Sequence, residues 1–187
     1  MKHMELAKAA ANAMSSVKVT PAVEQTAGPA STEFRHALGH FATGVTVITA
    51  LDDDGCLQGL TANAVSSVSL NPPLILACIT YTARSFSVLE RRRAFSLHIL
   101  AEGQAQIAKD FASNAERSSI CAWETTERGL PLLSEFHVAL ECSIEQIYPG
   151  GDHGIVVARV HQIHHGDKDV GPLLYYKGKM TPWSSVA

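Results

Sequence analysis

The residues best suited to chemistry gather in one short segment, GLTANAVSSVSLNPPL, at residues 59–74. Thr61 and Asn63 supply a hydroxyl and an amide, and Ala62 and Ala64 beside them are small. Alternate side chains of a strand face opposite ways, so small residues on one face let a flat ring approach the backbone. Backbone N–H and C=O groups can then bond the polar edge of that ring. A Ser/Thr-rich strand at a sheet edge, without any ligand, explains the pattern equally well.

A second group follows at Arg84 and Ser85, where a helix over residues 85–93 is expected to begin. The free N–H groups of a helix start favour an anion, and the guanidinium fork of arginine matches phosphate oxygens. The pair therefore predicts a phosphate site, with a solvated surface charge as the alternative for Arg84. The three arginines at residues 91–93 are more typical of a solvated helix end.

Histidine supplies a third possibility. His153 ends a turn at residues 151–153; with an unperturbed pKa near ~6.5 it could bind a phosphate when charged or donate a hydrogen bond when neutral. A turn histidine with an ordinary hydrogen bond is the alternative. His161, His164 and His165 suggest a metal, but on a strand His164 faces away from the other two, and no acidic or cysteine partner has a fixed spacing. The sequence therefore predicts no metal site.

Composition limits the classes of protein. The chain has 187 residues, of which 46% are apolar and 18% charged, and its net charge is −3. This is enough for one globular domain with a core, and it offers no broad positive surface for nucleic acid. The four cysteines form no CxxC pair, and no apolar run reaches the ~20 residues of a membrane helix. We expect reduced thiols, a cytoplasmic location, and no nucleic-acid or membrane partner.

The common signatures of nucleotide and nucleophile sites are missing. The sequence has no GxGxxG after a strand, no GxxxxGK[ST], no GxSxG and no HExxH. These motifs mark dinucleotide folds, P-loops, hydrolase nucleophiles and zinc proteases. A nucleotide bound by this chain must therefore be held by a different kind of fold.

The elements that must position these residues are mainly strands. Residues 1–31 are predicted to be a flexible tail with a short helix at residues 5–14, and the domain is predicted over residues 32–187. The pattern gives about seven strands, with a closing strand at residues 171–180, and only two or three helices. Strands without regular crossover helices argue against a parallel Rossmann-type sheet. A closed or nearly closed antiparallel barrel is predicted, because closure removes exposed edges.

Five blocks in this order resemble the short-chain flavin reductases, the reductase partners of two-component flavin monooxygenases. They are residues 34–50, 59–74, 95–112, 150–160 and 172–180. The resemblance implies a mainly β fold, a split antiparallel (Greek-key) β-barrel with a few flanking helices, as a homodimer. It also implies an enzyme in which NADH or NADPH reduces FMN or FAD by hydride transfer, and a monooxygenase that receives the reduced flavin. The cofactors carry this chemistry and the protein stacks their rings, so no catalytic triad is required.

The resemblance assigns roles at matching positions. His153 is implied as the catalytic residue, beside the nicotinamide or the flavin face. Tyr176, Lys177 and Gly178 match the nicotinamide region, with a closing strand end and a solvated lysine as the alternative. Flavin contacts are implied at Gly59, Leu60, Thr61, Ala62, Asn63, Ala64, Ser69, Cys78, Ile79, Thr80, Arg84 and Ser85, and near the flavin tail at Lys109 and Phe111.

The sequence departs from the common family pattern in several places. Ala64 stands where a serine is frequent, so backbone groups must bond the ring there. His98 stands where asparagine is frequent. Gly154 stands where a larger residue is usual, which predicts a wider nicotinamide site.

Three alternatives remain beside the flavin reductase. One is an enzyme that keeps its flavin and passes electrons to another acceptor, and another is a flavin-binding electron carrier or sensor without turnover. The third is an enzyme like the pyridoxamine-phosphate oxidases, which share the barrel architecture. The turn at residues 151–153 and the segment at 176–178 favour a reductase over a passive binder, because a binder needs no nicotinamide site. The run at residues 61–73 favours a reductase over the oxidase.

Overall fold

The computed structural model describes residues 28–113 and 122–185. The predicted tail helix at residues 5–14 and Cys121 lie outside the described residues. The chain divides into two compact units, residues 1–34 and 35–187. Of the first unit, residues 28–34 are described, and they hold the start of helix α2, Ser31–Leu38. All described strands belong to the second unit.

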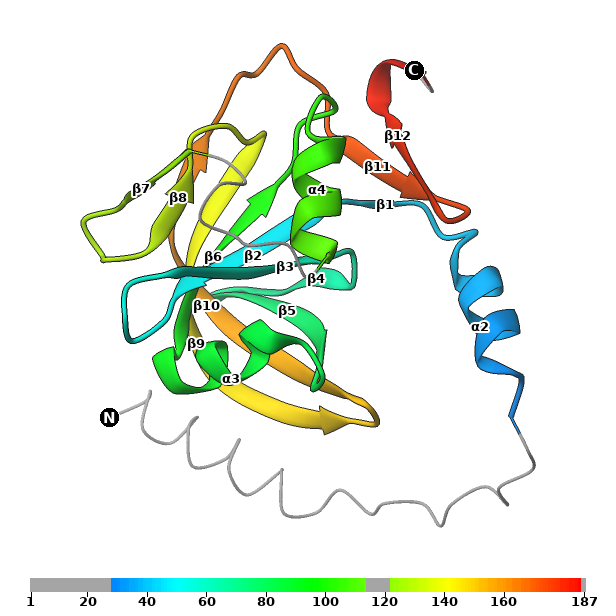
Figure 1. The fold of residues 1–187 in the computed structure, drawn as a ribbon, viewed down its shortest axis with the longest axis horizontal. Helices are drawn as coiled ribbons and strands as arrows, with labels where there is room; N and C mark the ends of the chain where they lie inside the picture. Colours follow the sequence, from blue (N-terminus) through cyan, green and yellow to red (C-terminus); the bar gives the residue numbers. More distant parts are fainter. Residues whose placement is uncertain (1–27, 114–121, 186–187) are drawn as a thin grey trace. The chain divides into compact units, whose positions relative to one another are not determined.

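Strands dominate the second unit, as Figure 1 shows. They are β1 (Thr43–Gly44), β2 (Thr46–Leu51), β3 (Leu57–Ala62), β4 (Val65–Leu70), β5 (Pro73–Thr80), β6 (Ala94–Ile99), β7 (Trp123–Thr125), β8 (Pro131–Leu133), β9 (Val138–Gly150), β10 (His153–His165), β11 (Leu173–Tyr176) and β12 (Lys179–Pro182). The helices of this unit are α3 (Arg84–Arg92), α4 (Ala105–Ala112) and the 3₁₀ helix η2 (Trp183–Ser185). Among the described residues, no helix is long and apolar enough to span a membrane.

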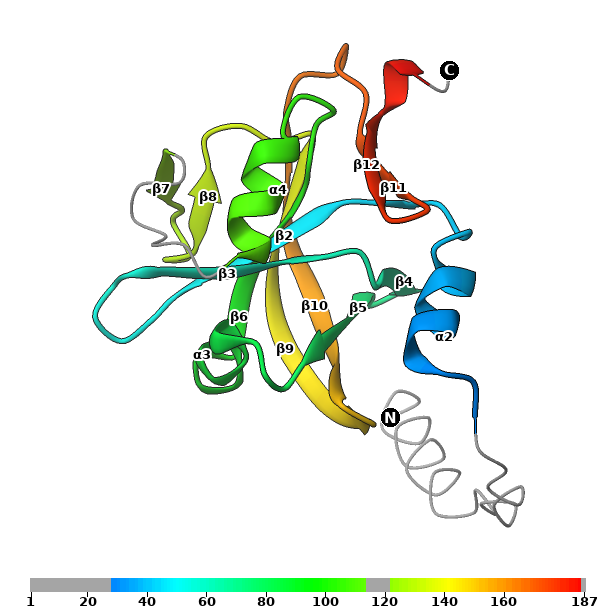
Figure 2. The ribbon, with the colours of Figure 1, turned by 45° about the vertical axis from the view of Figure 1, so that its right-hand side comes forward.

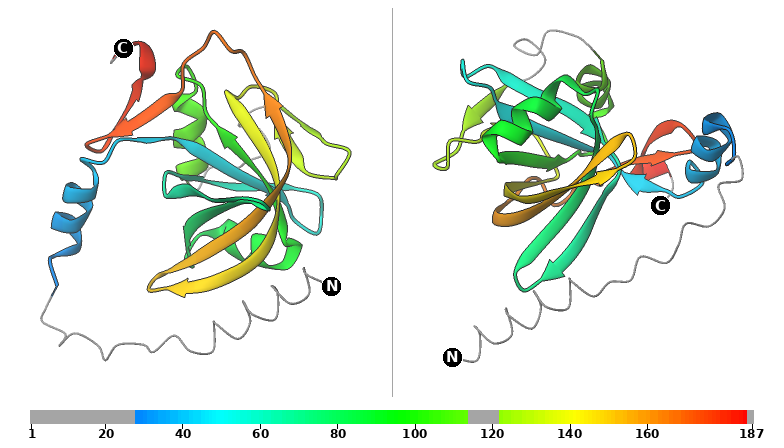
Figure 3. Two further views of the ribbon diagram at one scale, coloured as in Figure 1. Left: turned by 180° about the vertical axis from the view of Figure 1, so that it is seen from behind. Right: turned by 90° about the horizontal axis from the view of Figure 1, so that it is seen from below.

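Seven strands form one antiparallel sheet in the order β3-β2-β6-β9-β10-β5-β4. β9 and β10 are the longest, with 13 residues each. Register shifts after Val157 and Val160 disturb their ladder and favour the curl that Figures 2 and 3 show. The edge strands β3 and β4 follow one another in the chain but do not pair. The barrel is therefore split, and the predicted mainly β, antiparallel fold is confirmed.

Two hydrophobic clusters lie on opposite faces of β2, which is buried along almost its whole length. Ile48 belongs to a cluster with Phe86 and Leu89 of α3. Val47 belongs to the other cluster, with Phe111 of α4. Because neighbouring residues of a strand face opposite ways, α3 and α4 cover opposite faces of β2. The two helices therefore bracket β2 and its neighbour β3.

The segment at residues 59–74 is not one continuous strand. β3 ends at Ala62 and β4 begins at Val65. Ala62 is buried in the core at 8% exposure, and Ala64 is exposed beyond the strand end. The prediction that these two alanines open one strand face was wrong, because the alternation of side chains stops where the chain leaves the strand.

The last predicted strand is a hairpin. β11 and β12 pair with Tyr176 opposite Lys179, and Lys177 and Gly178 between them have φ of 48° and 78°. Two successive residues with positive φ make the tight turn that suits the twist of paired strands. β1 pairs with the other side of β11, so these strands form a separate three-stranded sheet. The prediction of one strand over residues 171–180 was wrong because the Lys-Gly turn signal was missed.

Candidate functional site

A cavity of about 420 Å³ lies where β3, the loop from β5 into α3, and the end of α4 meet. In both Figure 1 and Figure 2, α4 lies above β3 and α3 lies below it. The volume is in the range of small-molecule and cofactor sites. Seven of the lining residues are ones for which the sequence predicted cofactor contacts: Gly59, Leu60, Thr61, Thr80, Arg84, Ser85 and Phe111. The others are Thr82, Ala83, Ala112 and Ser113.

The start of α3 forms one wall of the cavity. Ala83 stands at the N-cap position and gives no side-chain cap, and the Phe86 N–H donates to the Ala83 carbonyl oxygen at 2.9 Å. The N–H groups of Arg84 and Ser85 are therefore left to water or a ligand. Ser85 is only 3% exposed, and its Oγ has no hydrogen-bond partner among the described residues. Leaving a buried hydroxyl unpaired costs about 1–3 kcal/mol. A ligand oxygen in the cavity would remove that cost.

Two threonines bring further hydroxyls to this wall. Thr80 Oγ1 and Thr82 Oγ1 lie 3.0 Å apart, and both residues line the cavity together with Arg84 and Ser85. We call these four residues the anion wall. None of the described lining residues is acidic, so nothing on the wall opposes a phosphate. Sequence reasoning missed Thr82; the only signal was a hydroxyl two positions before Arg84.

The opposite wall comes from β3 and α4. Phe111 is 1% exposed, and a Cβ added at Gly59 would lie 2.8 Å from its Cε1. Thr61 Oγ1 donates a hydrogen bond to the Ala108 carbonyl oxygen at 2.6 Å. The Thr61 hydroxyl therefore fastens α4 to β3. To a ligand, this wall therefore presents backbone groups of β3 and the apolar Phe111 side chain. It presents few side-chain hydrogen-bonding groups.

Several predicted contacts lie outside the lining of this cavity. Ala62 and Ile79 are core residues, and Lys109 is exposed on α4. The Cys78 N–H donates to the Ala64 carbonyl oxygen at 2.9 Å, which places the exposed β3–β4 connection beside β5. The remaining residues of this group are Asn63, which is exposed, and Ser69, which is half-buried on β4.

His153 lies at the start of β10, directly opposite Thr80 of β5 in the antiparallel ladder. The Tyr81 N–H donates to the Asp152 carbonyl oxygen at 3.2 Å. His153 Nδ1 lies 2.6 Å from Asp152 Oδ1, and the hydrogen bond from His153 lowers the pKa of that exposed carboxyl. Because Thr80 lines the cavity, the turn that carries His153 lies next to it.

Gly154 has a packing role. A Cβ at this position would lie 2.7 Å from Cε2 of Phe86 and 3.2 Å from Cγ2 of Ile147. The missing side chain is therefore replaced by the Phe86 ring, which belongs to the core under α3. The prediction that Gly154 widens a nicotinamide site was wrong, because the space it leaves is already filled.

Tyr176, Lys177 and Gly178 do not line the cavity. They form the β11–β12 turn, in a different sheet from β3 and β5. The Lys177 N–H donates to the Gly39 carbonyl oxygen at 2.7 Å, and the rings of Tyr176 and His40 meet edge to face with centroids 6.3 Å apart. Within one chain, the two regions that the sequence suggested for flavin and nicotinamide are thus carried by separate sheets.

The three histidines near the end of β10 have different surroundings. His161 Nε2 lies 2.7 Å from Ser143 Oγ, whereas His164 Nε2 lies 2.8 Å from Oε1 of the buried Glu141. His165 is exposed. Over residues 28–113 and 122–185, no group of three or more potential ligands comes together for a metal.

His98 is fully buried, and both of its ring nitrogens are used. Nδ1 lies 3.2 Å from the Val47 carbonyl oxygen, to which it must donate, and Nε2 accepts from the Leu133 N–H at 3.2 Å. Burial lowers the pKa of His98 to about 4. The histidine therefore stays neutral and ties β6 to β2 and β8, which is a structural role.

Together, the split antiparallel barrel and a cavity with an anion wall define a small barrel protein suited to a phosphorylated cofactor. The profile of the family described as "Flavin reductase like domain" matches residues 38–184. The chain belongs to this family, as the sequence predicted.

The relatives include reductase components of monooxygenases. The chain is 36% identical over 149 residues to the reductase subunit HsaB of a flavin-dependent monooxygenase from Rhodococcus jostii, covering 79% of this chain and 75% of that protein. It is 37% identical over 146 residues to an NADH-dependent flavin reductase from a Rhodococcus species, covering 77% and 81%. Other relatives are longer: the chain spans 55% of the stachydrine N-demethylase reductase subunit Stc3 from Rhizobium meliloti.

A solved structure gives the same fold with ligands. The NADH:FAD oxidoreductase SgcE6 of Streptomyces globisporus, in complex with NAD and FAD fragments, superposes with a TM-score of 0.76 at 32% identity. The match covers 81% of this chain and 92% of that one. The likeness therefore extends over nearly the whole barrel.

Proposed function

We propose that this chain is an NAD(P)H:flavin oxidoreductase that reduces FMN or FAD and supplies reduced flavin to a partner monooxygenase. One observation carries the proposal: the buried, unpaired Ser85 hydroxyl at an uncapped helix start, in a cavity without acidic lining residues among those described. Family membership and the names of the relatives support the same activity.

The residues of the anion wall fit the phosphate of a flavin nucleotide. The Ser85 hydroxyl and the free N–H groups of α3 would donate to phosphate oxygens, and the exposed Arg84 would neutralise their charge. Thr80 and Thr82 add two hydroxyls 3.0 Å apart. A bound flavin would supply the hydride acceptor for a hydride from NADH or NADPH.

The remaining walls would orient the flat ring. The close contact of Gly59 with Phe111 brings backbone and an apolar ring surface to one side of the cavity, and this excludes water from that side. The polar edge of the ring would meet the backbone groups of β3 near Leu60. No side chain here must gain or lose a proton, because positioning is the contribution required of the protein.

His153 is proposed to meet the nicotinamide. Asp152 accepts the hydrogen bond from its Nδ1, which leaves Nε2 to face the second nucleotide. The ladder pairing with Thr80 keeps the histidine next to the proposed flavin site.

A homodimer is proposed as the working form. The edge strand β4 carries Val68 and Leu70, which are 48% and 92% exposed, and an apolar edge strand is a ready surface for another chain. Tyr176 lies on a different sheet from the cavity. The Tyr176 turn of one chain does not line the cavity of that chain. In a homodimer, the turn that carries the partner subunit's Tyr176 would complete the cavity instead.

A flavin-binding carrier without turnover is the second candidate. The position of His153 beside the cavity favours a reductase, because a carrier needs no group for nicotinamide. The test is to mix the protein with NADH or NADPH and with FMN, FAD or riboflavin, and to follow absorbance at the nicotinamide band. Flavin-dependent oxidation of either nucleotide is expected. Tight flavin binding without oxidation of either would establish the carrier instead.

A further inference from the structure

A second cavity, of about 400 Å³, lies at the other end of α4. Gln104, the N-cap residue of α4, lines it, whereas Phe111 near the end of α4 lines the first cavity. No residue is shared between the two linings. The lining residues are Ala101, Gly103, Gln104, Ser134, Glu135, Phe136, Gly166, Asp167 and Val170.

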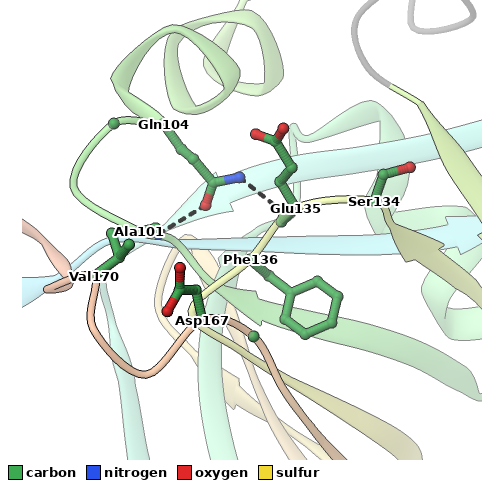
Figure 4. Close-up of a pocket in the computed structure, with 9 residues that line it drawn as sticks. Ala101, Gln104, Ser134, Glu135, Phe136, Asp167 and Val170 are labelled. Atoms are coloured by element: carbon green, nitrogen blue, oxygen red, sulfur yellow. Dashed lines mark hydrogen bonds between the residues drawn. The ribbon is translucent and has the colours of Figure 1, made fainter.

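The walls of this second cavity are fixed by hydrogen bonds. Gln104 is 5% exposed, its Oε1 accepts from the Ala101 N–H at 2.7 Å, and its Nε2 donates to the Glu135 carbonyl oxygen at 2.8 Å. Three loops, at residues 101–104, 134–136 and 166–170, supply the lining. Figure 4 shows the Gln104 carboxamide bridging the first two of them. The third loop is tied by the Gly166 N–H, which donates to the His137 carbonyl oxygen at 3.0 Å. The cavity is therefore formed without a ligand and needs little ordering to bind one.

The lining combines an aromatic ring with negative charge. Phe136 is half-buried and packs near His98, with ring centroids 6.1 Å apart. Glu135 and Asp167 are the charged residues among the described lining, and both are carboxylates. Asp167 Oδ1 accepts from the Asp169 N–H at 3.0 Å, which leaves Oδ2 for a ligand. Figure 4 shows Phe136 and Asp167 on the same side of the Gln104 carboxamide.

The charge balance selects a cation. The N-terminus of α4 adds about half a positive charge to this region, and Lys168 on the same loop as Asp167 adds one more, against the carboxylates of Glu135, Asp167 and Asp169. Figure 4 shows the Glu135 carboxylate on the other side of the Gln104 carboxamide, so Asp167 is the carboxylate beside Phe136. An anion such as a nucleotide phosphate is disfavoured here. A ring with an ammonium group matches both features, since the Asp167 carboxylate attracts the ammonium and the face of Phe136 accepts either a ring or a cation.

We propose that this second cavity binds small aromatic amines, as a site separate from the flavin cavity. The proposal does not depend on the reductase function. The volume is in the range of small-molecule sites, and the carboxylates are exposed to solvent, so binding is expected to be modest and to weaken with added salt.

The probe is 2-phenylethylamine, compared with phenylacetate and 2-phenylethanol of similar size. Methyl resonances of Ala101 and Val170 would be followed by NMR in the full chain, first without FMN and then with FMN present. Saturable shifts with the amine, at least tenfold tighter than with the acid, are expected. Equal binding of amine and acid, or shifts that FMN abolishes by competition, would overturn the proposal, as would no saturable binding of the amine.

Variants locate the site. Asp167→Asn is expected to weaken the amine about tenfold and to leave 2-phenylethanol unchanged. Asp169→Asn, on the same loop but outside the lining, is the matched control and is expected to bind like the parent protein. If Asp167→Asn and Asp169→Asn weaken the amine equally, the attraction is general surface charge and the proposal fails.

Discussion

Gly59 and Phe111 lie so close that a Cβ at position 59 would come within 2.8 Å of the Phe111 ring and 2.7 Å of the Ile48 carbonyl oxygen. The Phe111 ring can yield but the Ile48 backbone oxygen of β2 cannot, so Gly59→Ala should force β3 away from β2 and displace the Phe111 ring of α4. A loss of about 1–3 kcal/mol in the free energy of unfolding is expected from this overpacking, together with a higher KM for flavin. Denaturant unfolding and steady-state kinetics check both. Gly44→Ala is the control, because no heavy atom lies within 4 Å of a Cβ there.

Ser85→Ala should change stability and binding in opposite directions. It removes a buried hydroxyl that has no partner among the described residues, so the free energy of unfolding should stay level or rise by about 1 kcal/mol. The same change should weaken FMN about tenfold, since a hydrogen bond to a charged phosphate is lost. Thermal unfolding and fluorescence titration measure the two effects. The exposed Ser87→Ala on the same helix serves as control, and parallel losses of stability and affinity in Ser85→Ala would contradict the assignment.

Arg84→Ala tests whether Arg84 binds the phosphate of the flavin or its ring. We expect about a tenfold weaker affinity for FMN and an unchanged affinity for riboflavin, which lacks phosphate. Arg92→Ala, at the far end of α3, should leave both unchanged. Equal losses for FMN and riboflavin would remove Arg84 from the phosphate site. The dissociation constants come from flavin fluorescence quenching.

Burial of His98 predicts how the free energy of unfolding changes as the pH falls. Its pKa is lowered from 6.5 to about 4 in the folded protein, so the unfolded chain takes up the proton first as the pH falls. The stability that the neutral ring provides is complete above about pH 6.5 and is lost progressively down to about pH 4, by at most about 3 kcal/mol. His98→Asn should flatten this part of the profile of unfolding free energy against pH. His165→Asn, an exposed replacement, should retain the parent slope.

His153→Ala tests the nicotinamide side. The affinity for FMN should be unchanged, while the KM for NADH rises or kcat falls. Asp152→Asn should give a smaller change in the same direction, because it weakens only the hydrogen bond to Nδ1. Kinetics that match the parent in both variants would make His153 a structural turn residue. His161→Ala, which loses a contact with Ser143 and lies outside the lining of the cavity, is the control.

Much of this fold could be predicted from local patterns in the sequence. The alternation along β9 and β10 and the scarcity of crossover helices predicted an antiparallel barrel, and the seven-stranded sheet is antiparallel. Arg84 and Ser85 at a helix start predicted an anion site from chemistry alone, and both residues line the cavity.

Other features depend on contacts between distant segments, which no local pattern contains. The unpaired state of Ser85 follows from packing around α3, and the filled space beside Gly154 follows from where Phe86 lies. The second cavity joins loops at residues 101–104, 134–136 and 166–170. The sequence shows these loops only as separate connections.

The pairing of Thr80 with His153 also limits how the chain can change in length. An antiparallel ladder that slips by one residue sends every side chain to the opposite face. The turn between β9 and β10 has only Gly151 and Asp152, with Gly151 at φ 73°, so an inserted or deleted residue there would displace His153 from Thr80. By contrast, the turn at residues 53–55 is exposed and contributes no lining residue to either cavity. Insertions and fused tags belong in that turn, and the β9–β10 turn should keep its present length.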